Sequence, residues 1–118
     1  MTLDELKNKL KNGEPIEFEE VMQVIETYYD YIPSRFVNGI KQDKVINEAG
    51  KNEGSCKIFA FARLHQLTEA QTLACFGHFY RDDVLKHPEN FDHANIRMFM
   101  RDGWQGIEFK RTVLVEKQ

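Results

Sequence analysis

The most reactive side chain in this sequence, the thiol of Cys56, follows a run of small and polar residues at positions 47–55. The stretch after it is mainly apolar, so the sequence predicts a buried helix over about 55–66 that begins near this cysteine. A helix N-terminus lowers the pKa of a thiol, because the dipole and free N–H groups favour the thiolate. With His78 or His93 as the base, Cys56 would be the nucleophile of a hydrolase or transferase. The alternative is that Cys56 is a small buried packing residue.

The same helix start offers a second kind of chemistry, the binding of a small polar or anionic ligand. Residues 47–54 are rich in Asn and Gly, and the first N–H groups of a helix have no partner within it. Arg81 or Arg97 would clamp the anion. The alternative is an internal network that only stabilises the fold. The candidate ligand-binding residues are Asn38, Asn47, Asn52, Glu53, Ser55, Arg81, Asn95 and Arg97, with His93 beside them.

The histidines form no metal-binding motif. The chain has four, and none is spaced as HxH, HxxxH or HExxH. His78 and His93 would make a site only if the fold brought them together with Asp92 or Glu53. We therefore expect no metal and no cofactor.

Length and charge limit the class of protein. The chain has 118 residues, 42% of them hydrophobic, which predicts one domain with its own core. Its net charge is −3 and it has no basic run, so we expect no nucleic-acid partner and no membrane binding. The N-terminal segment lacks a signal-peptide core, and two cysteines are typical of free thiols in a reducing compartment. These features predict a cytoplasmic protein.

Capping signals and periodicity predict the elements that position these residues. Thr2–Glu5 and Thr68–Gln71 have the spacing of capping boxes. Apolar residues recur at helical spacing from Phe18 to Tyr29, and Pro33 must follow the end of that helix. We expect helices over about 2–11, 17–30, 55–66, 68–77 and 93–101, with Asp92 capping the last. Short strands are expected at 36–37, 45–46, 107–109 and 112–115.

Together these elements predict a single compact, helix-dominated α+β domain over residues 1–118. The buried central helix would carry a small antiparallel sheet. We expect the C-terminal strand region, 107–115, to pair with the region around Phe36.

Several runs resemble a known family. They are Phe36–Gly39, the long run Asn47–Phe61, Leu73–Gly77 with Tyr80 and Arg81, His93–Arg97, and Gly103–Trp104. With these runs the chain resembles the HopJ (HopPmaJ-like) type III effector family from about Phe18 to Phe109. Lys51 stands where the family run is expected to have Gln. The resemblance implies a compact α+β fold and, if the family role applies, secretion by a type III system. It implies no activity, cofactor or catalytic residue.

Three functional hypotheses follow. The leading one is a small binding or interaction module with a polar site at the start of the central helix. The first alternative is the thiol-dependent enzyme that uses Cys56. The second is an effector that docks onto a host protein through an exposed apolar patch.

Overall fold

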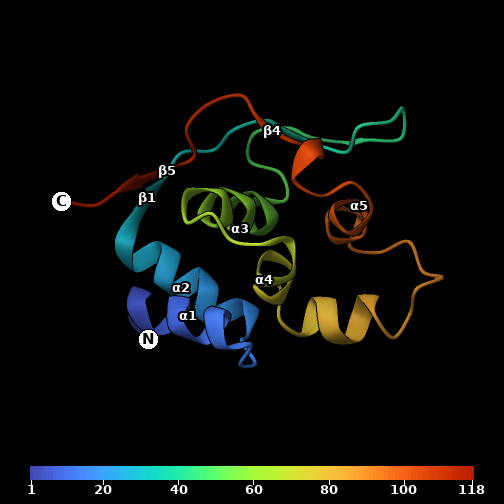
Figure 1. Ribbon diagram of the computed structural model, residues 1–118. Coiled ribbons are helices and arrows are strands. Elements are labelled where there is room, and N and C mark those ends of the chain that lie inside the picture. The colour runs from blue at the N-terminus through green and yellow to red at the C-terminus, as the bar shows by residue number, and fades with distance from the viewer.

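The computed structural model describes residues 1–118, in which the helices lie on one side of a short antiparallel ladder of strands (Figure 1). The α-helices are α1 (Leu3–Asn12), α2 (Phe18–Tyr28), α3 (Glu53–Leu64), α4 (Glu69–Ala74) and α5 (Ala94–Asp102). A π-helical turn, η1 (Phe79–Val84), and a 3-10 turn, η2 (Gly103–Gly106), follow α4 and α5. The strands are β1 (Tyr29–Tyr31), β2 (Phe36–Asn38), β3 (Val45–Asn47), β4 (Ile107–Phe109) and β5 (Leu114–Glu116).

Helix α3 lies at the centre of the molecule, as its apolar sequence predicts (Figure 1). Ile58, Phe59 and Phe61 are completely buried. The ring of Phe59 lies within 6.5 Å, centroid to centroid, of rings from β2, α5 and η2, as well as that of Phe76 after α4. A helix that packs on several sides at once needs apolar residues on most of its circumference, which explains the near-continuous apolar run.

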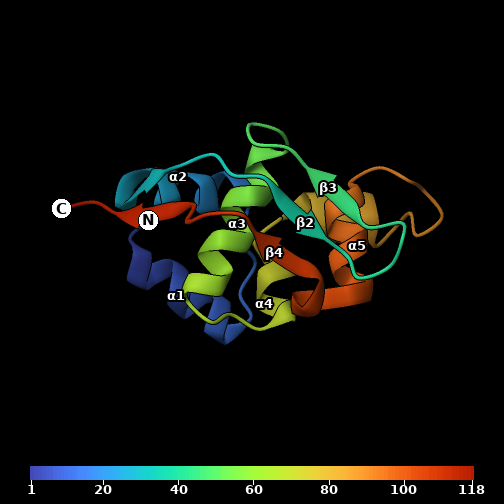
Figure 2. The same cartoon turned by 90° about the horizontal axis from the view of Figure 1, so that it is seen from above.

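The strands cover α3 from above, and β2 and β3 also contact α5 (Figure 2). Strand β2 is central, with β3 and β4 antiparallel on either side. The pairing predicted for the C-terminal region is confirmed for β4, since Phe109 faces Phe36. It is wrong for β5, which pairs with β1 so that Leu114 faces Tyr31.

A proline explains where β5 pairs. Residues 29–31 and 36–38 face 114–116 and 107–109 in one continuous register. Pro33 lies between the two halves, and it has no N–H to donate to a ladder. One antiparallel ribbon is therefore interrupted and forms two short sheets, a continuity that the strand patterns of the sequence do not predict.

The predicted helix starts are confirmed where the capping signal is local. Thr2 and Thr68 cap α1 and α4, each in a complete capping box. The starts of α3 and α5 differ from expectation: α3 begins at Glu53, with Asn52 at its N-cap position, rather than near residue 55, and His93 rather than Asp92 occupies the N-cap position of α5. None of the helices is both long enough and apolar enough to cross a membrane.

Candidate functional site

The first turns of α3 and α5 open onto one pocket of about 400 Å³. The α3 side contributes Gly54 and Ser55, and the α5 side contributes Asn95 and Ile96. The two helices come from segments about forty residues apart in the sequence. Pockets of this size are typical of small-molecule sites. The full lining is Phe18, Val45, Asn52, Gly54, Ser55, Phe76, Phe79, His93, Ala94, Asn95 and Ile96.

Both helices begin with a residue in the left-handed conformation. Asn52 has φ 51° and His93 has φ 52°, and neither side chain caps its own helix. The first main-chain bonds within each helix are donated by Cys56 to Asn52 and by Arg97 to His93. The N–H groups before these two residues have no acceptor within their helices. Two positive helix ends therefore meet at one pocket, an arrangement that favours an anion.

Four asparagine side chains hold the two helix starts together. Asn47 and Asn95 exchange amide hydrogen bonds, Nδ2 to Oδ1, of 3.1 and 2.9 Å. Asn38 donates to the Asn95 main-chain oxygen at 2.8 Å, and Asn52 donates to Asn47 Oδ1 at 2.7 Å. Asn38, Asn47 and Asn95 are buried. The predicted amide cluster thus exists, and it connects β2 and β3 to the starts of α3 and α5.

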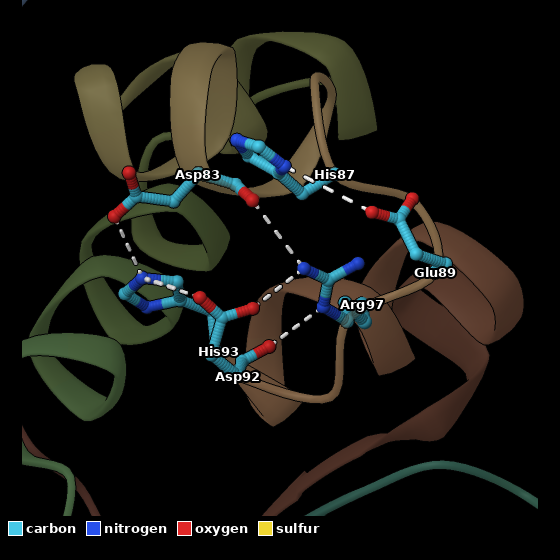
Figure 3. A network of polar contacts seen from close by, with 6 residues as sticks. All are labelled: Asp83, His87, Glu89, Asp92, His93 and Arg97. Atoms are coloured by element: carbon cyan, nitrogen blue, oxygen red, sulfur yellow. Dashed lines mark hydrogen bonds and ion pairs between the residues drawn. The ribbon is translucent and has the colours of Figure 1, made fainter.

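His93 turns its ring away from its own helix and toward a carboxylate (Figure 3). Its Nε2 lies 3.0 Å from Asp83 Oδ2 and 3.8 Å from Asp92 Oδ2. Because Nε2 is hydrogen-bonded to Asp83, Nδ1 is the other ring nitrogen with which His93 can donate or accept a hydrogen bond. The ring also lies 5.3 Å from that of Phe79, centroid to centroid. His93 is therefore held in place at the pocket by a carboxylate and an aromatic ring.

The two arginines expected to clamp an anion do not line the pocket. Arg81 donates to the Ile16 carbonyl at 2.7 Å and to Glu17 Oε2 at 2.6 Å. Arg97 donates to Asp92 (Figure 3), and it lines a different pocket, with Val84 and Met100. The guanidinium–Glu17 bond keeps the pKa of that carboxyl below its usual range. The prediction that Arg81 or Arg97 clamps an anion in this pocket fails for the same reason in both cases: each guanidinium already forms an ion pair with a carboxylate of the protein.

Cys56 does not have the properties of the predicted nucleophile. Its side chain is buried, and Sγ contacts the Ser34 carbonyl at 3.9 Å. Burial raises the pKa of the thiol, so the expectation of a lowered pKa is wrong. The helix begins at Glu53, three residues before Cys56, and this places the thiol beyond the first free N–H groups. The second cysteine, Cys75, is also a buried free thiol, and its pKa is raised to about 12.

His78, the other predicted base, does not line the pocket and lies beside Phe79. Its ring lies tilted against that of Phe79 at 4.3 Å between centroids, and its Nδ1 lies 3.4 Å from Glu17 Oε1. His78, Glu17 and Glu19 are close enough to share a metal ion, with ligand atoms within 4.8 Å of one another. A metal there would compete with Arg81, which already binds Glu17. Of the remaining candidates, Glu53 is exposed at the start of α3 and does not line the pocket.

Exposed apolar side chains come from several separate elements. Phe91, at 95% exposure, is the most prominent and lies in the loop before α5. The others are Ile32, Ile40, Ile46, Leu64, Leu85, Met100 and Val115. Single exposed apolar residues are ordinary on protein surfaces.

Sequence reasoning missed the aromatic wall of the pocket. Phe18, Phe76 and Phe79 line it, and they come from α2, the turn after α4 and η1. In the sequence Phe18 is simply part of the apolar face of a helix. One signal was available: Gly54, in the first turn of a helix, where a Cβ would lie 2.7 Å from Phe18 Cζ. A glycine at such a position indicates the close approach of another group.

Comparison with known proteins finds a matching family and a similar solved structure. A family model described as HopJ type III effector protein matches residues 3–114. The crystal structure of an unknown function protein, VPA0580, is similar with a TM-score of 0.92 and 51% sequence identity, covering 99% of this chain and 95% of that one. No curated protein matches the chain.

Proposed function

The chain belongs to the HopJ type III effector protein family, and from that premise we propose that it is a small binding module whose ligand is an anion seated between the first turns of α3 and α5. One observation carries the proposal: two uncapped helix starts face the same pocket. Each start offers main-chain N–H groups and the positive end of a helix dipole.

The environment of the pocket supports an anion over a cation. No carboxylate side chain belongs to its lining, and the polar groups there are main-chain N–H groups, amides, Ser55 and the ring of His93. The carboxylate nearest to His93, on Asp83, is occupied by the imidazole Nε2. Backbone donors that are fixed by buried amides need no reorganisation when a ligand arrives, which favours binding.

A charge placed at the helix start tests the proposal. We expect inorganic phosphate and acetate to shift the amide NMR signals of Gly54, Ser55 and Ala94–Ile96 in the wild-type protein. In the variant Ser55→Asp the new carboxylate repels the ligand and satisfies the free N–H groups itself, so affinity falls at least about tenfold. Stability is unchanged or rises by up to about 1 kcal/mol, since an acidic residue suits a helix N-terminus.

Gln71→Glu is the matched control. Gln71 is the third residue of α4, as Ser55 is of α3, and α4 is already capped by Thr68. The control adds the same charge at a helix start away from the pocket, so anion binding should persist. Absence of shifts in the first turns of both α3 and α5 in the wild type, or equal binding by Ser55→Asp, would contradict an anion site.

The family description also bears on where the protein acts. We propose that the chain is made in the cytoplasm and is exported when the cell that makes it carries a type III secretion system. An epitope-tagged chain should then be found in the culture medium of a secreting strain and be absent from the medium of a strain that lacks the apparatus. Equal amounts in both media would contradict export by this route.

A further inference from the structure

The pocket has an aromatic half that a bare anion does not use. Three phenylalanine rings, those of Phe18, Phe76 and Phe79, line it together with the polar helix starts. We propose that the ligand is an aromatic anion, a planar ring that carries its phosphate or carboxylate group directly or through one atom. This inference rests on the proposed anion site and specifies the chemical class of its ligand.

The aromatic half is a fixed surface. Phe18 and Phe79 meet edge to face, with centroids 5.3 Å apart and ring planes at 83°. Phe76 is buried and packs on Phe59 of the central helix, 5.6 Å between centroids. The His93 ring, which also lines the pocket, lies 5.3 Å from that of Phe79, centroid to centroid. Edge-to-face and offset contacts are the arrangements that aromatic rings prefer, so a further planar ring is well matched to this wall.

The distance between the two halves restricts the ligand. Phe18 packs so closely on the start of α3 that a side chain at Gly54 would overlap its ring. The aromatic wall therefore adjoins the free N–H groups of the same helix turn. A ligand that fills both halves must hold its ring and its charge next to each other, which an aryl phosphate or aryl carboxylate does. A long flexible spacer between ring and anion would not fit this arrangement.

Paired ligands separate the ring from the charge. The experiment measures binding of phenyl phosphate against methyl phosphate, and of benzoate against acetate, to the full-length protein by calorimetry and amide NMR. We expect the aromatic member of at least one pair to bind at least about tenfold more tightly. The pair that shows the larger preference identifies the anionic group.

The outcomes distinguish the two proposals. If methyl phosphate or acetate binds at the helix starts and the aromatic member binds no better, the aromatic half has no role and this inference is wrong while the anion site stands. If none of the four compounds shifts the amides of these helix turns, both proposals are wrong. Phenol provides the remaining comparison: equal affinity for phenol and phenyl phosphate would overturn the anion site and with it the aromatic anion.

A conservative variant tests the wall itself. Phe18→Leu keeps an apolar side chain but removes the ring, so the preference for the aromatic ligand should fall at least threefold while the affinity for methyl phosphate is retained. The matched control is Phe109→Leu, because Phe109 is also partly buried but packs on Phe36 in the sheet. An unchanged preference in Phe18→Leu, or an equal loss in Phe109→Leu, would contradict the assignment of the wall.

Discussion

Four helices of this chain begin in two different ways. Helices α1 and α4 start with Thr2 and Thr68, whose hydroxyl groups accept from the N–H three residues later, in complete capping boxes. Helices α3 and α5 start with Asn52 and His93, both left-handed and without a side-chain cap. At the capped starts, side chains of the helix accept hydrogen bonds from first-turn N–H groups. At the uncapped starts no such side chain is present, and both helix ends line a shared pocket.

The difference separates helix ends that serve stability from helix ends that serve a site. A capping box stabilises a helix using residues of that helix alone. At α3 and α5 the capping side chains are used elsewhere: Asn52 bonds Asn47, and His93 bonds Asp83. The protein thus supports these helices through contacts with other elements, and it keeps their first donors free. Binding sites are often places where local stabilisation is given up.

The strongest test breaks the connection that the two uncapped starts share. Asn95→Ala removes three amide hydrogen bonds and leaves Asn47 partly unpaired in a buried place. We expect the free energy of unfolding to fall by about 2 kcal/mol, measured by chemical denaturation, because buried polar groups without partners are costly. Anion binding should weaken as well, since the helix starts lose their common support.

Asn8→Ala is the control for this variant. Asn8 is exposed on α1, so its removal should change stability by less than about 0.5 kcal/mol. If Asn95→Ala costs no more than this control, the amide cluster does not stabilise the junction, and the contrast between the two kinds of helix start loses its basis.

A smaller effect is expected at a capped start. Thr68→Ala removes the hydroxyl that accepts from the Gln71 N–H at 3.1 Å. Loss of such a cap costs about 1 kcal/mol, which denaturation measures as a lower midpoint with an unchanged slope. Anion affinity should stay at the wild-type value because α4 begins away from the pocket. Weaker binding in Thr68→Ala would mean that the two kinds of start are not independent.

The smallest effect distinguishes the two capped starts from each other. In α1 the Thr2 N–H donates to Glu5 at 3.0 Å, and this bond holds the pKa of the Glu5 carboxyl below its usual range. A carboxyl with a lowered pKa in the folded protein adds stability above its unfolded pKa, and this contribution disappears as the pH falls through the folded value. In α4 the equivalent residue is Gln71, which does not titrate.

Glu5→Gln makes the first capping box like the second. The carboxyl signal of Glu5 should titrate below the usual range of a glutamate in the folded wild type when followed by NMR. The Gln variant should lose less stability than the wild type on acidification, because it no longer has a carboxylate to protonate at this position. Identical pH dependence of the two proteins would show that the capping bond is not formed in solution.

The candidate site was predictable in part. The sequence indicated the polar loop before α3 and the asparagines Asn38, Asn47, Asn52 and Asn95, because Asn and Gly before an apolar run are typical of an irregular helix start. It also indicated His93. The sequence did not indicate the aromatic wall, since Phe18 and Phe79 look like ordinary core residues until their neighbours are known. Nor did it indicate that carboxylates occupy Arg81 and Arg97.

Features whose partners lie a few residues apart can be predicted from the sequence alone. The capping boxes at Thr2 and Thr68 and the buried character of the central helix follow from spacing and composition alone, because the interacting groups are close in the chain. The tertiary structure decided what depends on distant segments. It joined the starts of α3 and α5 at one pocket, buried Cys56, and paired β5 with β1. Such contacts arise from packing of the whole chain, and a local pattern carries no information about which distant segment will supply the partner.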